Sequence, residues 1–207
     1  MKLYGHPMST CTRKVLTTLA ENGLAYELEL VDFAKGEHKQ QPHLARQPFG
    51  QIPAIDDGGF ELYESRAICR YLDEKVGGKL VPKDIQGRAR MEQWISIETS
   101  NFTPHAMKFI YHHVFKRSQD EAVLGAAGTG LETALRVMDE RLAASPYLAG
   151  DEFTLADICY MPYLEYVMAT PAKALITKHA HVAAWWTKIS ARPSWFKATG
   201  RGDAKTS

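Results

Sequence analysis

Most strand-like segments occur in the first 76 residues of the chain and few occur after about residue 86, and this asymmetry limits the folds open to the chain. Within residues 1–76 the pattern reads strand, helix, strand, a loop or short helix, then strand, strand and helix. Asp57-Gly58-Gly59 is a hairpin turn signal between the last two strands. That order predicts a small sheet with helices packed on it. After about residue 86 the apolar residues repeat with helical spacing, so we expect an all-helical second domain.

The predicted elements of the first domain are short. The expected strands are Lys2–Tyr4, Tyr26–Val31, Gln51–Asp56 and Phe60–Tyr63, and the expected helices are Thr12–Glu21 and one opening at Glu64-Ser65. Two glycines and a proline within residues 76–82 indicate a linker. We therefore divide the chain into a sheet domain over residues 1–76, a linker over 77–86 and a helical domain over 87–207.

The second domain offers several helix signals. A long helix is expected over Met91–Phe115, broken or bent at Pro104, and another over Leu124–Ala144. Thr154 and Asp157 form a capping box for a helix that runs to about residue 168. Shorter helical pieces follow over residues 181–191 and 194–197. Removal of Asp157 is expected to cost roughly 1–2 kcal/mol of stability, as loss of a helix cap does.

The composition excludes several functional classes. The 207 residues carry a formal net charge of +1, so no global field favours nucleic acid or an anionic membrane. No apolar run approaches the ~18–20 residues of a membrane helix, and the first residues do not form a signal peptide. Three cysteines, Cys11, Cys69 and Cys159, are too few for a disulfide framework. A reducing compartment is expected, and we place the protein in the cytoplasm.

Five short motifs, in order, give the chain a family resemblance. They are G-H-P-M-S-T-C-T-R-K-V-L (5–16), K-G-E-H-K (35–39), P-F-G-Q-I-P-A-I-D-D (48–57), L-Y-E-S-R-A-I (62–68) and L-A-G-D-E-F-T-L-A-D (148–157). Together they resemble the serine-type, phi-class glutathione S-transferases over nearly the whole chain. One departure is Gln47, where the phi-like pattern usually has asparagine. The resemblance implies a thioredoxin-like domain followed by a helical domain, with glutathione as co-substrate.

Ser9 is the catalytic residue that the resemblance implies. A thiol of pKa ~8.5 is only a few per cent ionised at neutral pH, and the thiolate is the reactive form. Lowering that pKa by ~2 units takes about 2.7 kcal/mol, of which one hydrogen bond to the charged sulfur supplies roughly 1.5–3 kcal/mol. Ser9 stands just before the first predicted helix. A serine there can also simply cap that helix, and the residues alone leave both roles open.

The resemblance also implies which residues bind glutathione. Ile52 would pair through its backbone with the cysteinyl unit, next to a cis bond to Pro53. Glu64 and Ser65 open a helix whose N-terminus suits the γ-glutamyl carboxylate. His38 and Lys39 are expected at the glycyl carboxylate, with Gln51 adding a side-chain hydrogen bond. All seven are assigned to glutathione: His38, Lys39, Gln51, Ile52, Pro53, Glu64 and Ser65.

The electrophile should meet an apolar pocket built largely by the helical domain. The candidates are aromatic, histidine or long apolar side chains: Met8, Phe33, Phe109, His112, His113, Phe115, Tyr160, Tyr163 and Leu164. His112 and His113 have no Glu-x-x-His or cysteine partner, so no metal is expected. By resemblance, Phe49 would insert into a second subunit, which predicts a homodimer.

Three alternatives stay open. Cys11 near a helix start could form a mixed disulfide with glutathione, which would make the protein a thiol transferase or a dehydroascorbate-type reductase. In the resembling families with that chemistry, however, the cysteine matches the position of Ser9. The chain could also be a non-catalytic module that binds hydrophobic ligands. Glutathione-dependent peroxidase activity would use the same thiolate and is compatible with the sequence.

Overall fold

The structure is a computed structural model that describes residues 1–201. The chain divides into two compact units: residues 1–79 together with the segment that begins at Arg192, and residues 80–191. Within the described residues, no helix is both long and apolar enough to cross a membrane. The last six residues of the predicted helical domain, 202–207, lie outside the described part of the chain.

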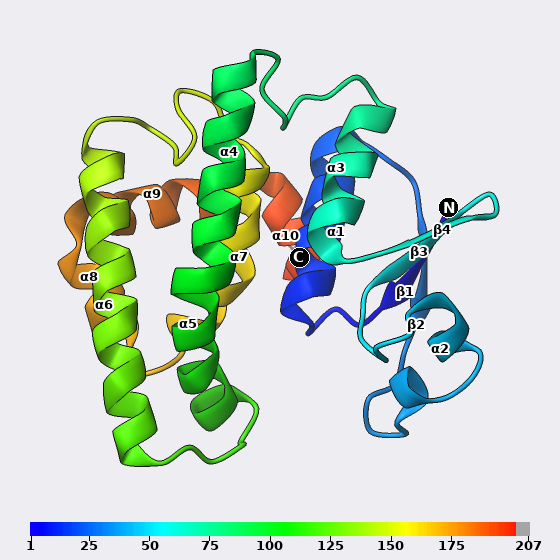
Figure 1. Ribbon diagram of the computed structural model, residues 1–207, viewed down its shortest axis with the longest axis horizontal. Helices are drawn as coiled ribbons and strands as arrows, with labels where there is room; N and C mark the ends of the chain where they lie inside the picture. The colour runs from blue at the N-terminus through cyan, green and yellow to red at the C-terminus, as the bar shows by residue number, and fades with distance from the viewer. Residues whose placement is uncertain (202–207) are drawn as a thin grey trace, which may run out of the picture. The chain divides into compact units, whose positions relative to one another are not determined.

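The first unit contains a four-stranded sheet with the order β2-β1-β3-β4 (Figure 1). Its strands are β1 (Lys2–Gly5), β2 (Glu27–Leu30), β3 (Ala54–Asp57) and β4 (Phe60–Tyr63). β1 and β2 are parallel, whereas β3 is antiparallel to both of its neighbours. Gly58 and Gly59 both have positive φ, which is the backbone that a tight hairpin between β3 and β4 requires. The predicted strand order along the chain is confirmed.

The helices of this unit build its core against the sheet. They are α1 (Thr10–Asn22), η1 (Glu37–Lys39), α2 (His43–Arg46), α3 (Ser65–Lys75) and α10 (Pro193–Thr199). α1 packs on α3, and each buries an apolar face that includes Val15 and Leu19 from α1 and Ile68 and Leu72 from α3. α1 ends where Gly23 adopts a left-handed conformation with φ 64°.

The last helix, α10, packs on α1 rather than with the helices that precede it in sequence. Trp195 is fully buried, and the Arg192 guanidinium donates two hydrogen bonds to the Glu21 carboxylate, at 2.6 and 2.8 Å. Burial by itself raises the pKa of Glu21, but the hydrogen bonds from Arg192 and Ser194 outweigh it and leave that pKa below its ordinary value. The structure thus differs from the sequence-based division, which assigned this helix to the domain over residues 87–207.

The second unit consists of helices joined by loops, and its described residues contain no strand. It contains α4 (Ile85–Ile97), η2 (Glu98–Phe102), α5 (Thr103–Phe109), η3 (Ile110–Val114), α6 (Glu121–Ala143), α7 (Leu155–Val167), α8 (Lys173–Lys178) and α9 (Ala180–Ser190). The helix expected from Met91 begins at Ile85 instead, because Asp84 caps it by accepting from the Gly87 amide at 2.7 Å. The irregularity expected near Pro104 is confirmed, since the π-helical turn η2 directly precedes α5, in which Pro104 is the second residue.

The capping box at the start of α7 is confirmed and is fully buried. The Thr154 hydroxyl accepts from the Ala156 amide at 3.2 Å, and one Asp157 oxygen accepts from the Thr154 amide at 2.9 Å. The other Asp157 oxygen accepts from the Leu148 amide and the Trp185 indole, at 3.2 and 3.0 Å. Asp157 therefore ties α9 and the preceding loop to the start of α7, beyond capping one helix.

Candidate functional site

The strand register brings the predicted site segments to one end of the sheet. Tyr4 pairs with Ala54, and Ala54 pairs with Tyr63. Because β1 and β4 run toward this end and β3 runs away from it, three segments meet there: the loop after β1, the residues before β3 and the start of α3. Gly5 pairs with Leu30 in the parallel strand β2, so the loop after β2 leaves from the same end. Four motifs that are far apart in sequence thus share one edge of the first unit.

Ser9 is the N-cap of α1. Its backbone is extended, with φ −75° and ψ 128°, and its hydroxyl oxygen accepts a hydrogen bond from the Thr12 amide at 3.2 Å. The residue is half-buried. A hydroxyl can donate one hydrogen bond while it accepts others. Capping therefore uses only the acceptor capacity of Ser9 and leaves its hydrogen for another acceptor, so the two roles considered from the sequence are compatible.

The residues that follow Ser9 have different environments. Thr12 is fully buried, its hydroxyl accepts from the His6 amide at 3.4 Å, and a side chain at Gly5 would come within 2.8 Å of it. Thr12 is thus a core residue that fixes the close approach of α1 to β1. Cys11 is half-buried on the first turn of α1 and carries a free thiol.

The peptide bond between Ile52 and Pro53 is cis, as predicted. Both residues are buried and come directly before β3. Among residues 1–201, neither the backbone amide nor the carbonyl of Ile52 has a hydrogen-bond partner. Ile52 therefore presents a free donor and a free acceptor at this edge.

Two residues that the sequence did not single out for the site hold the backbone of Gln51. The Gln51 amide donates to the Gln47 side-chain oxygen at 2.9 Å, and the Gln51 carbonyl accepts from the His43 ring at 2.6 Å. His43 and Gln47 are 5% and 1% exposed. The only sequence signal was Gln47, which departs from the usual asparagine; nothing in the pattern indicated His43.

Glu64 has an unusual backbone conformation at the start of α3. Its φ is 72° and its ψ is 107°, in a residue that is not glycine. Such a conformation costs on the order of 1–3 kcal/mol and is concentrated at functional sites. Glu64 is exposed, and the neighbouring Ser65, the first residue of α3, is 3% exposed. The site thus has a strained acidic residue beside a helix N-terminus of the kind that binds anions.

His38 and Lys39 lie in η1, on the loop after β2. The His38 ring packs against Phe33, with ring centroids 4.5 Å apart. Burial lowers the pKa of His38, and the charges of Lys39 and His43 lower it further. The Lys39 ammonium donates to the Phe49 carbonyl at 2.8 Å. Lys39 therefore ties this loop to the segment that leads to Ile52.

The electrophile-pocket candidates divide by exposure. Met8 and Phe33 in the first unit are 47% and 46% exposed. In the second unit four candidates are half-buried: Phe109, His112, His113 and Phe115. The remaining three are buried in α7: Tyr160, Tyr163 and Leu164. Tyr160 donates to the Trp94 carbonyl at 3.1 Å and contacts the Phe102 ring, which are contacts of a core residue.

His112 and His113 have separate surroundings. The His112 ring accepts a hydrogen bond from the Gln119 amide at 3.0 Å. Burial lowers the pKa of His113, and the charges of His112 and Lys116 lower it further. Within the described residues, no group of three or more histidine, cysteine, aspartate or glutamate side chains is placed to hold a metal ion.

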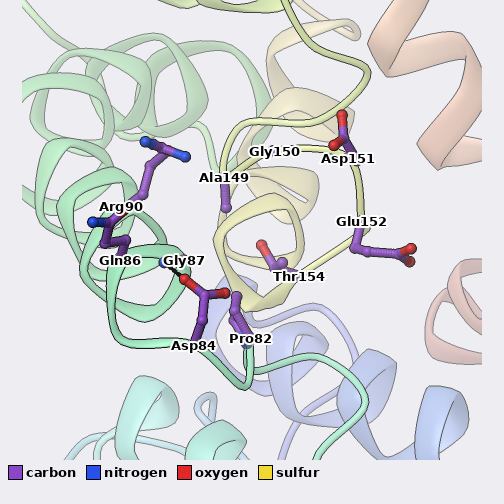
Figure 2. A pocket seen from close by; sticks show the side chains of 10 residues that line it. All are labelled: Pro82, Asp84, Gln86, Gly87, Arg90, Ala149, Gly150, Asp151, Glu152 and Thr154. Carbon is purple, nitrogen blue, oxygen red and sulfur yellow. Dashed lines mark hydrogen bonds between the residues drawn. The ribbon is translucent and has the colours of Figure 1, made fainter.

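The second unit has a polar cavity of about 260 Å³ between the start of α4 and the loop before α7 (Figure 2). Ten residues line it: Pro82, Asp84, Gln86, Gly87, Arg90, Ala149, Gly150, Asp151, Glu152 and Thr154. None of these belongs to the predicted glutathione or electrophile residues. One of its carboxylates, Asp84, is already engaged as the cap of α4.

Comparison with known proteins identifies the kind of protein that carries this fold. Residues 1–74 match the glutathione S-transferase N-terminal domain, and residues 102–193 match the glutathione S-transferase C-terminal domain. Glutathione S-transferase F9 of Arabidopsis thaliana is 38% identical over 203 residues, which are 94% of each chain. The chain belongs to the glutathione S-transferase family, in its phi class, and is an enzyme of the type EC 2.5.1.18.

Comparison with solved structures gives the same family. Glutathione transferase F7 from Populus trichocarpa has a TM-score of 0.92 and 38% identity, with 98% of this chain and 99% of that chain covered. Glutathione S-transferase I from mais, solved in complex with an atrazine glutathione conjugate, has a TM-score of 0.90 and 33% identity, with 99% and 98% covered. The expected architecture, a thioredoxin-like domain plus a helical domain, is confirmed.

Proposed function

We propose that this enzyme binds glutathione at the sheet edge described above and that the Ser9 hydroxyl stabilises the glutathione thiolate, which then attacks small hydrophobic electrophiles. The observation that carries the proposal is the register of the sheet, because it gathers the Ser9 loop, Ile52, the start of α3 and the His38 loop at one end. The glutathione conjugate in the related mais structure supports the same class of ligand.

The chemical step needs little from the protein beyond stabilisation of a negative charge. The glutathione thiol releases its proton to water, and the Ser9 hydroxyl donates its free hydrogen to the sulfur anion. The amides at the start of α1 add a favourable partial charge. With an aryl halide, the sulfur forms a bond to the ring carbon and the halide leaves with the bonding electron pair.

Each end of glutathione meets a group of suitable charge. The γ-glutamyl carboxylate binds at the amides and hydroxyl of Ser65, and Glu64 accepts from the γ-glutamyl ammonium. The free amide and carbonyl of Ile52, next to Pro53, pair with the cysteinyl backbone as an added strand would. His38, Lys39 and the exposed Gln51 side chain serve the glycyl end.

The exposed fractions favour some electrophile contacts over others. Met8 and Phe33 in the first unit and the half-buried residues of α5 and η3 in the second present more surface than the three α7 candidates. Peroxidase activity stays a prediction. In that reaction the thiolate sulfur would attack the terminal hydroperoxide oxygen, the O–O bond would break and the alkoxide would leave as the alcohol. A second glutathione thiol would then convert the sulfenic acid to glutathione disulfide and water. Cytoplasmic location also stays a prediction, supported by three cysteines that all carry free thiols.

We also propose a homodimer in which Phe49 of each copy enters the other. Phe49 is 66% exposed, which is unusual for a phenylalanine. The second unit has a mainly apolar groove of about 390 Å³ between the α4–α5 segment and α6, large enough for an aromatic ring. Its lining includes Ile97, Ala134 and Val137. Phe49→Ala should yield a species of 23.2 kDa in analytical ultracentrifugation, where the wild type gives twice that mass; a monomeric wild type would refute this arrangement.

The first experiment compares wild type with Ser9→Ala in glutathione conjugation to a chromogenic aryl halide. Loss of the hydroxyl should reduce turnover about 10²-fold or more. The variant should still be retained on immobilised glutathione, because the binding groups are intact. Unchanged turnover would refute the role of Ser9.

Cys11→Ser is the matched control for the thiol alternative. If a mixed disulfide at Cys11 carries the activity, Cys11→Ser abolishes it and Ser9→Ala does not. If the wild type binds glutathione without turnover, the non-catalytic binding module is the better description.

A further inference from the structure

Buried side chains hold the peptide planes on both sides of Gln51: His43 bonds to the Gln51–Ile52 plane and Gln47 to the Gly50–Gln51 plane. The His43 ring donates to the Gln51 carbonyl at 2.6 Å, and the Gln47 side-chain oxygen accepts from the Gln51 amide at 2.9 Å. A carbonyl oxygen can only accept, so the ring nitrogen Nε2 of His43 carries the hydrogen. The other ring nitrogen, Nδ1, is buried and has no partner within the described residues, which also favours the Nε2–H tautomer.

The orientation of the Gln51–Ile52 plane determines where the Ile52 amide points. The described residues contain two cis peptide bonds, Gln41–Pro42 and Ile52–Pro53, so the Gln51–Ile52 bond is trans. In a planar trans peptide the C=O and the following N–H point in opposite directions. Because the Gln51 C=O points at His43 on α2, the Ile52 N–H must point away from α2. The hydrogen bond from His43 thereby fixes the direction of the free donor at the site edge.

We propose that His43 and Gln47 are positioning residues for glutathione: they hold the Gln51–Ile52 backbone so that the Ile52 amide faces the cysteinyl carbonyl of the tripeptide. This inference rests on the proposed function, in which Ile52 pairs with glutathione. Neither side chain touches the ligand. Each acts through the backbone of Gln51, which is outside the paired strands and has no ladder partner to hold it.

The burial of the two side chains makes this hold rigid. His43 and Gln47 are 5% and 1% exposed, so water does not compete for their hydrogen bonds. The turn between Gln47 and Gln51 is tightly packed as well. Gly50 has φ 59°, and a side chain there would meet the Lys39 side chain at 2.6 Å and the His38 carbonyl at 2.7 Å. The loop from α2 to Ile52 therefore has little freedom to reorient.

The test compares two substitutions at His43 by calorimetric titration with glutathione. His43→Phe keeps the ring volume and removes the donor, whereas His43→Gln places an amide nitrogen near the position of Nε2. We expect about tenfold weaker glutathione binding for His43→Phe and less than about threefold for His43→Gln, as one net hydrogen bond predicts. KM for glutathione should rise in parallel, with KM for the electrophile little changed.

Gln47 supplies an independent pair of variants if His43→Phe does not fold. Gln47→Met is similar in shape and has no acceptor, whereas Gln47→Glu keeps one. Gln47→Met should weaken glutathione binding and shift the Ile52 amide resonance in a nitrogen-15 NMR spectrum. Gln47→Glu should bind glutathione, and place that resonance, as the wild type does.

Two results would overturn the proposal in distinguishable ways. If wild type binds glutathione and His43→Phe binds it equally well, or if both His43 variants lose binding equally, the positioning role is wrong and the proposed function stands. If the wild type itself does not bind glutathione, the proposed function fails and this inference fails with it.

Discussion

The starts of α1 and α7 use the same local device for different purposes. Each helix has a hydroxyl residue at its N-cap, Ser9 or Thr154, that accepts from a backbone amide at 3.2 Å. At α7 the cap is 3% exposed, and its partner Asp157 is fully buried and accepts hydrogen bonds on both oxygens. At α1 the cap is half-buried and keeps a hydrogen to donate. A cap whose hydrogen bonds are all made within the fold stabilises the structure. A cap that keeps a free hydroxyl hydrogen at the end of the sheet can also donate it to a ligand.

The largest expected effect is the loss of stability when Asp157 is replaced at the start of α7. Asp157→Ala removes the acceptor of four buried donors: the Leu148 amide, the Thr154 amide and hydroxyl, and the Trp185 indole. We expect a loss of roughly 3 kcal/mol or more in unfolding free energy, above the 1–2 kcal/mol of a simple cap. Chemical denaturation measures it, with Asp157→Asn as the intermediate control. A melting curve like that of the wild type would show that the network contributes little.

A smaller effect separates stability from chemistry at the two caps. Thr154→Ala should cost about 1–2 kcal/mol of stability with normal turnover per folded molecule, whereas Ser9→Ala should cost at most about 1 kcal/mol of stability while turnover falls. Both variants are compared by denaturation and by the aryl halide assay. If both variants lose stability and turnover in the same proportion, the distinction between a structural Thr154 and a chemical Ser9 is wrong.

The smallest effect concerns the other end of α1, where Glu21 binds Arg192. The pKa of Glu21 is lowered in the folded state, so its contribution is complete above its unfolded pKa of ~4.3 and is lost as pH falls through the lower folded value. Glu21→Gln should cost about 1–2 kcal/mol at pH 7. Its deficit relative to wild type should shrink below pH ~4. A deficit that stays constant across this range would exclude the ion pair as its cause.

The sequence predicted what depends on contiguous residues. The hairpin glycines, the Thr154–Asp157 box and the Ile52–Pro53 motif each lie within a few residues, and the structure confirms all three. The positive φ of Glu64 was not predictable, because no glycine marks it and the surrounding fold imposes it. The hydrogen bond between His43 and Gln51 was not predictable either, because it depends on how the loop between these residues folds. The roles of the site residues remain predictions.

α10 belongs to the first unit although 112 residues of the second unit, 80–191, separate it from residue 79. During synthesis the sheet and α1 leave the ribosome long before Trp195 is made, and until then the face of α1 that α10 covers stays bare. The first unit is thus complete only after α10 has been synthesised. A gene fragment that stops after residue 79 encodes this unit without its last helix, and a recombinant version would need residues 192–201 joined back to it.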